Sequence, residues 1–147
     1  MKLVDHALKL AIQYHNGHVN PYDDEPYMHH LQRVFIRVRD DMRGTEIQQA
    51  AAWLHDAIED RDLTVAILEA DKVIPERLVN ALIALTHIKN EPYVDYCRRC
   101  WLDPDARIVK RADLIDNFSR NHLIEDPARA ERMRVKYSKG LAILNRV

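Results

Sequence analysis

The sequence predicts an all-α fold of about seven or eight helices in one domain that spans residues 1–147. Apolar residues recur at three- and four-residue intervals along most of the chain, which is the period of an amphipathic helix. Strand-like alternation, internal repeats and low-complexity linkers are absent from the sequence. Two pairs, Asp103-Pro104 and Asp126-Pro127, combine a capping residue with a first-turn proline and so mark helix starts.

The N-terminal part of the chain is expected to form two helices joined by a loop. Apolar spacing over residues 2–16 predicts the first helix, which Gly17 ends. Residues 18–25 hold turn formers without an apolar period and are expected to form a loop across the mouth of the bundle. The second helix begins near Pro26, which suits a first helical turn, and ends before Gly44.

Six further helices complete the predicted fold. Thr45 and Gln48 form a capping box that begins the third helix, which is expected to continue to Arg61. Two shorter packing helices follow, one capped by Thr64 and one opened by Pro75. After a break in the periodicity, three more helices are predicted over residues 93–101, 104–118 and 127–144.

The composition limits the possible classes of function. With 47% hydrophobic and 31% charged residues, the chain has enough apolar material for a core without disulfides. A net charge of -1 gives no general attraction to nucleic acid or to an acidic membrane, so we expect neither as a partner. The sequence shows no membrane-spanning run and no secretion signal, which favours a cytoplasmic protein. It leaves the oligomeric state open.

The stretch Ala51–Asp60 places four ionisable groups within an apolar, helix-favouring run. Such a run is expected to be buried, and burying a histidine and a carboxylate costs several kcal/mol unless something pairs with them. His55 and Asp56 can share one divalent cation as that partner. Glu59 and Asp60 follow at four-residue spacing and so lie one turn further along the same face, beside the ion.

Asp113 is another carboxylate on an apolar helix face. It interrupts the inward positions of the helix at residues 104–118 and needs a partner, which the same cation would supply. Lys110 lies three residues before it and Asn117 four residues after it, so both can line the same side of the helix. Their chemistry suits a phosphate and a sugar or base.

Four blocks of the sequence, in order, resemble the HD superfamily of metal-dependent phosphohydrolases. The family reads H-x-G, P-Y-x-x-H, A-A-x-L-H-D-x-x-E-D and V-K-x-A-D-x-x-x-N, which corresponds to residues 15–17, 26–30, 51–60 and 109–117. The resemblance is strongest to the hydrolase domain of RelA/SpoT-type alarmone enzymes and to their small single-domain relatives. It implies a compact HD-domain helical bundle.

The resemblance also implies a metal site. The implied ligands are His30, His55, Asp56 and Asp113. His29 is a neighbouring alternative to His30, but the spacing from the preceding Pro-Tyr pair favours His30. Two nitrogen and two oxygen donors suit Mn²⁺, Fe²⁺ or Zn²⁺ better than Ca²⁺, and the resemblance favours Mn²⁺.

The resemblance assigns further roles around the ion. Glu59 and Asp60 are expected to orient a water molecule and to handle its proton, with an ion pair to Arg61 or a capping role as the alternative. Asn117 is expected to bind substrate because the corresponding asparagine of alarmone hydrolases contacts nucleotide. Lys110, from its spacing to Asp113, and Arg33, as a basic residue that could offset the acidic loop, are the other expected substrate-binding residues.

These features predict a metal-dependent nucleotide (pyro)phosphohydrolase, with (p)ppGpp 3'-pyrophosphohydrolase as the first candidate. The alternatives are an HD hydrolase of another nucleotide, such as a dNTP, NADPH or a nucleoside monophosphate, and a non-catalytic nucleotide-binding HD module. The predicted loop carries Asp23, Asp24 and Glu25, where alarmone hydrolases usually have a basic pair. Because these acids repel phosphate, we expect weaker or altered alarmone selectivity.

Four other residues receive no active role. Cys97 and Cys100 form a C-x-x-C that could be half of a zinc site or a redox pair, but no further ligands follow at recognisable spacing. We therefore expect reduced thiols. His87 is interpreted as a loop side chain, and Asp116 stands where the superfamily usually has histidine or aspartate.

Overall fold

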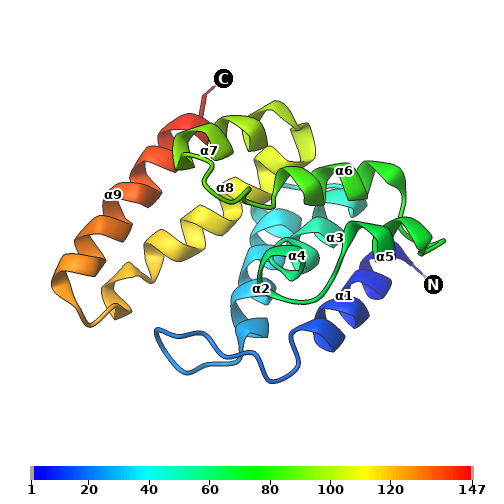
Figure 1. The fold of residues 1–147 in the computed structure, drawn as a ribbon, viewed down its shortest axis with the longest axis horizontal. Helices are drawn as coiled ribbons and strands as arrows, with labels where there is room; N and C mark the ends of the chain where they lie inside the picture. Colours follow the sequence, from blue (N-terminus) through cyan, green and yellow to red (C-terminus); the bar gives the residue numbers. More distant parts are fainter. Residues whose placement is uncertain (1, 147) are drawn as a thin grey trace.

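The computed structural model describes residues 2–146, which form a bundle of α-helices without strands (Figure 1). The predicted all-α class is confirmed. The helices, with a π-helical segment η1 and a 3-10 segment η2, are α1 (Leu3–Tyr14), α2 (Tyr27–Ile36), η1 (Arg37–Asp41), α3 (Glu46–Leu54), α4 (Ala57–Asp60), α5 (Val65–Ala70), α6 (Glu76–Ala84), α7 (Tyr93–Leu102), α8 (Pro104–Ser119), η2 (Asn121–Leu123) and α9 (Pro127–Leu144). None of the helices described is both long and apolar enough to cross a membrane.

Helix α3 lies at the centre of the bundle because its C-terminal half is apolar on every side. The consecutive residues Ala50–Leu54 are all buried, as in a helix enclosed by others. It packs against α1, α2, α6 and α8. Ala7 and Ala11 are fully buried, and their small side chains let α1 approach α3 closely.

The third predicted helix is in fact two helices, which corrects the sequence analysis. Helix α3 ends before His55, and α4 begins after Asp56. The His55 ring donates a hydrogen bond from Nδ1 to the Ala52 carbonyl at 2.7 Å, and Asp56 has φ -105° and ψ -2°. In an unbroken helix successive side chains point about 100° apart. The turn instead lets both side chains face α2 and α8.

The loop between α1 and α2 crosses one end of the bundle, and backbone contacts join its two ends (Figure 1). Gly17 ends the first helix with a φ of +73°, as its position in the sequence predicted. Val19 and Pro26 form an isolated antiparallel bridge, and the Asn20 N–H donates to the Glu25 carbonyl at 2.8 Å. These bonds tie the loop to the start of α2.

Helices α7, α8 and α9 pack together at a glycine. Helix α9 contacts both α7 and α8 (Figure 1). A Cβ atom on Gly140 would lie 2.7 Å from Leu114 Cδ1 and 3.1 Å from the Tyr93 hydroxyl. The missing side chain therefore lets α9 lie close to the other two helices.

We predict that Gly140→Val lowers the free energy of unfolding by about 1–3 kcal/mol, because the added methyl groups overlap Leu114 and Tyr93. Ala142→Val is the matched control, since Ala142 is exposed on the same helix and loses only helix propensity, about 0.5 kcal/mol. Chemical denaturation followed by circular dichroism measures both variants. Equal stability of the two would contradict close packing at Gly140.

Candidate functional site

Four side chains from three parts of the chain meet at one point. His30 lies on α2, His55 and Asp56 lie between α3 and α4, and Asp113 lies on α8. One ligand atom from each lies within 4.8 Å of the others. His30 Nε2 is 3.0 Å from Asp113 Oδ1, and His55 Nε2 is 3.1 Å from Asp56 Oδ2. The structure thus brings together the four residues that the sequence nominated as ligands.

Both histidine rings are held so that Nε2 faces this cluster. A carbonyl oxygen only accepts hydrogen bonds, so the contact with Ala52 places the hydrogen of the His55 ring on Nδ1. His30 Nδ1 lies 2.8 Å from Asp116 Oδ2 and donates to that carboxylate. In its neutral form each imidazole then carries its free lone pair on Nε2, which is the form that a cation requires.

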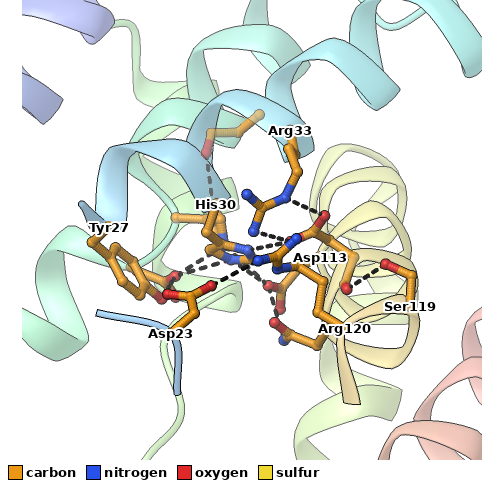
Figure 2. Close-up of polar contacts among 12 residues, drawn as sticks. Asp23, Tyr27, His30, Arg33, Asp113, Ser119 and Arg120 are labelled. Atoms are coloured by element: carbon orange, nitrogen blue, oxygen red, sulfur yellow. Dashed lines mark hydrogen bonds and ion pairs between the residues drawn. The ribbon is translucent and has the colours of Figure 1, made fainter. Parts of the chain in front are cut away.

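Asp116 is in turn fixed by Arg33. The guanidinium donates two hydrogen bonds to its carboxylate, at 2.8 and 3.1 Å. Figure 2 shows His30 and Arg33 pointing from α2 toward α8. Burial raises the pKa of the Asp116 carboxyl, but hydrogen bonds from His30 and Arg33 outweigh it and lower that pKa. Sequence reasoning missed this contact of Asp116, and substrate binding by Arg33 stays a prediction.

The cluster holds carboxylates whose ionised form is stabilised although they are buried. Burial raises the pKa of Asp113, but the charge of Lys110 and hydrogen bonds from both histidines hold it well below its usual range. Burial lowers the pKa of His30, yet its bonds with Asp113 and Asp116 raise it to about 9. The ionised carboxylates attract positive charge to this point. Together with two imidazole nitrogens, they form a donor set that fits a divalent cation.

His29 lies outside the cluster. Its side chain is about half exposed, and Nδ1 is 3.2 Å from Glu25 Oε2. His30, by contrast, is buried. The geometry therefore agrees with the spacing argument that favoured His30.

Tyr27 holds the carboxylate of Asp56, a role that sequence reasoning missed. Its hydroxyl donates a short hydrogen bond to Asp56 Oδ2. Its ring stacks on His18, with the centroids 4.2 Å apart, and also on His15 at 5.3 Å. The first two sequence blocks therefore meet beside the candidate metal ligands and orient one of them.

Glu59 and Asp60 reach the same place from α4. Glu59 Oε1 accepts the His87 N–H at 2.8 Å. Burial and the charges of Asp56 and Glu59 raise the pKa of Asp60 to about 7. The alternative ion pair with Arg61 is not among the contacts of the described residues, and Arg61 Nε donates instead to a carbonyl at the end of α1.

Lys110 and Asn117 both contact the buried ligand Asp113. Lys110 Nζ lies 2.9 Å from Asp113 Oδ2, and Asn117 Nδ2 lies 3.3 Å from Asp113 Oδ1. Both also line the cleft beside the cluster, so a ligand there can reach them. Their predicted contacts with substrate are compatible with this position and stay predictions.

An open cleft adjoins the cluster and runs between α4, the loop before α2 and α9. One part is lined by Tyr27, Asp56, Glu59, Asp60, His87, Tyr93, Tyr96, Lys110, Asp113, Leu114, Asn117, Met133, Lys136 and Tyr137. The other part shares Tyr27, Asp60, Asn117 and Tyr137 with it and extends along the loop. Sequence reasoning gave α9 no part in the site, because its apolar period does not show that Met133, Lys136 and Tyr137 border a cleft.

The acidic loop is less repulsive than its sequence indicates. Asp23 Oδ2 lies 2.7 Å from an Arg120 guanidinium nitrogen, and Figure 2 shows the two side chains meeting. Glu25 lies beside the ring of His29. Asp24 has a positive φ of 54° at the turn. The charge of Asp23 is therefore offset by Arg120, which reduces its repulsion of a phosphate near the loop.

The cysteines and His87, which were expected to take no active role, form contacts of their own, although His87 also lines the cleft. Cys97 and Cys100 are buried and free, and Cys100 Sγ lies 3.2 Å from the Ala84 carbonyl. His87 Nε2 donates to the Glu91 carbonyl at 2.7 Å. Its side chain is therefore bound within its own loop, as its interpretation from the sequence required.

Comparison with known proteins establishes the fold. No protein-family model and no curated protein matches the sequence. A solved structure of a metazoan protein, described as an orthologue of SpoT that hydrolyses ppGpp and plays a role in starvation responses, is similar with a TM-score of 0.82. The chains share this fold. The similarity covers 99% of this chain and 86% of the other at 21% sequence identity.

We predict that His55→Ala, Asp56→Ala and Asp113→Ala each abolish stoichiometric metal binding, because each removes one of four ligands. Elemental analysis after loading with Mn²⁺, Fe²⁺ or Zn²⁺ measures this. His30→Ala is expected to do the same, and His29→Ala, which changes an exposed neighbouring ring, is the control. Metal at the wild-type level in the ligand variants would rule out the site.

Proposed function

We propose that the protein is a metal-dependent nucleotide phosphohydrolase, with (p)ppGpp as the first candidate substrate. The observation that carries this proposal is the convergence of four metal ligands with two further carboxylates and a lysine in one cleft. Phosphoryl transfer needs these parts, since a cation and amines stabilise phosphate charge and a carboxylate handles the proton of the attacking water.

Mn²⁺ is the proposed cation, with Fe²⁺ and Zn²⁺ as alternatives. Two imidazoles and two carboxylates suit all three. When bound, such an ion polarises a phosphoryl oxygen and lowers the pKa of a bound water molecule. The chain's own contribution is to hold the four ligands in place through Ala52, Asp116 and Tyr27.

Glu59 and Asp60 are the proposed catalytic residues. Hydrolysis forms a bond from water oxygen to phosphorus, breaks the bond from phosphorus to the sugar oxygen, and transfers a water proton to a carboxylate, which returns a proton to the leaving sugar oxygen. Asp60, with its pKa raised to about 7, is suited to exchange that proton near neutral pH. Glu59 is anchored by the His87 N–H and is suited to orient the water.

Lys110, Asn117 and Arg33 are the proposed substrate-binding residues. Lys110 and Asn117 flank Asp113 on the cleft side of α8, where a phosphate and a ribose can meet them. Arg33 lies in the adjoining hollow near the loop. Arg33 donates to Asp116 through Nε and one terminal nitrogen. Only the other edge of its guanidinium can therefore contact a substrate.

The nucleotide itself is inferred from two considerations. The similar structure is described as hydrolysing ppGpp, and the sequence blocks resemble alarmone hydrolases. The loop acids favour a lower affinity for ppGpp than a basic loop would give, although Arg120 offsets Asp23. A dNTP, NADPH or a nucleoside monophosphate is the alternative substrate, and a non-catalytic nucleotide-binding module is the alternative class.

Steady-state kinetics with a nucleotide panel tests the function. We expect the protein loaded with Mn²⁺ to hydrolyse ppGpp with a higher kcat/KM than a dNTP, NADPH or a nucleoside monophosphate, and to lose activity on chelation. If another nucleotide of the panel gave a higher kcat/KM, that nucleotide would replace ppGpp as the proposed substrate. Absence of turnover across the panel would favour the non-catalytic module.

Glu59→Gln should retain metal and lose about 10²-fold or more in kcat, because the amide keeps the hydrogen bond from His87 but cannot accept a proton. Glu69→Gln is the control, since Glu69 is an exposed residue of α5. Kinetics and metal analysis are measured on the same samples. A kcat within a few-fold of wild type would transfer the role to Asp60.

A further inference from the structure

The wall of the cleft formed by α7, α8 and α9 carries two amines above two aromatic rings. Lys110 Nζ lies 4.8 Å from the centroid of the Tyr96 ring, and Lys136 Nζ lies 4.6 Å from that of Tyr93. The two rings are themselves in edge contact, with centroids 6.1 Å apart. Both lysines line the part of the cleft that also holds Asp56 and Asp113. Both amines therefore border the same cleft as the candidate metal ligands Asp56 and Asp113.

The two amines differ in their partners. Lys110 is buried and forms an ion pair with Asp113 at 2.9 Å, so part of its charge serves the metal site. Lys136 has no carboxylate within 4.0 Å among residues 2–146, although four carboxylates line the same cleft. A different cation of α9, Arg134, is paired with Glu131. The Lys136 ammonium thus lies over the ring of Tyr93, a contact that uses none of its hydrogen-bond donors and leaves them for a ligand.

We propose that Lys136 binds a second phosphate group of the substrate, beyond the one at the metal. Two adjacent amines on one side of a cation site suit a diphosphate, whose charge extends over several ångströms, better than a single phosphate. The substrate class is therefore a nucleotide that bears a diphosphate or a longer phosphate chain, rather than a nucleoside monophosphate. This inference rests on the proposed function and specifies its substrate.

Lys136→Met is the test variant, because methionine keeps an unbranched side chain on Tyr93 and removes only the charge. Lys139→Met is the matched control, since Lys139 is exposed on the same helix and does not line the cleft. Lys136→Arg tests whether restoring positive charge restores binding. Binding of inorganic pyrophosphate and of inorganic phosphate to protein loaded with Mn²⁺ is measured by calorimetry, with metal content checked afterwards.

We expect Lys136→Met to weaken pyrophosphate binding about tenfold, the effect of losing one charge-assisted hydrogen bond, and to change phosphate binding less than threefold. Lys139→Met should bind both as wild type does, and Lys136→Arg should recover most of the loss. Unchanged pyrophosphate binding in Lys136→Met, or equal losses for both anions, would overturn the inference.

Kinetics with the nucleotide panel separates this inference from the proposed function. If wild-type protein hydrolyses a diphosphate nucleotide and Lys136→Met has the same kcat/KM, the subsite is wrong and the function stands. If wild-type protein hydrolyses nothing, yet Lys136→Met loses pyrophosphate binding as expected, the function is wrong and the subsite stands.

Discussion

The carboxylate of Asp113 is the interaction on which the arrangement of the site depends. It is buried, and it contacts His30 from α2, His55 from the end of α3 and Lys110 on its own helix at 3.0, 3.3 and 2.9 Å. A buried charge that loses its partners costs several kcal/mol, so these contacts restrict how α2, α3 and α8 can move relative to one another. Apolar packing brings the three helices together, and this charge fixes their register.

The two histidines are oriented by different means, and the difference explains two features of the fold. His55 uses a backbone carbonyl of its own helix, which accompanies the break between α3 and α4. His30 uses a carboxylate on another helix, Asp116, which Arg33 holds in place. Each ring presents Nε2 to the same point. Loss of Arg33 would therefore act first on the orientation of the His30 ring and only second on substrate binding.

Two of the candidate ligands could be nominated from the residues alone because they interrupt an apolar pattern, whereas His30 was nominated through the family resemblance. His55 and Asp113 stand among residues that must be buried, and a buried polar group without a partner is rare. The turn at Asp56 could not be predicted, since it accompanies a bond between a side chain and a carbonyl that helix periodicity does not report. Lys136 gave no signal either. It is exposed within an ordinary amphipathic helix, and only the packing of α9 on α7 places it beside the cleft.

The distribution of charge in the cleft connects cation binding to phosphate binding. Four carboxylates from α4, the preceding turn and α8 line the cleft together with two lysines, Lys110 and Lys136, and each ionised carboxylate repels a phosphorylated ligand. A divalent cation held by the four candidate ligands would offset this repulsion. Charges in the cleft that lie within about 10 Å of one another interact with little screening by dissolved ions. Under the proposed function, the cation would therefore contribute to substrate affinity as well as to the chemistry, and metal would bind before the nucleotide.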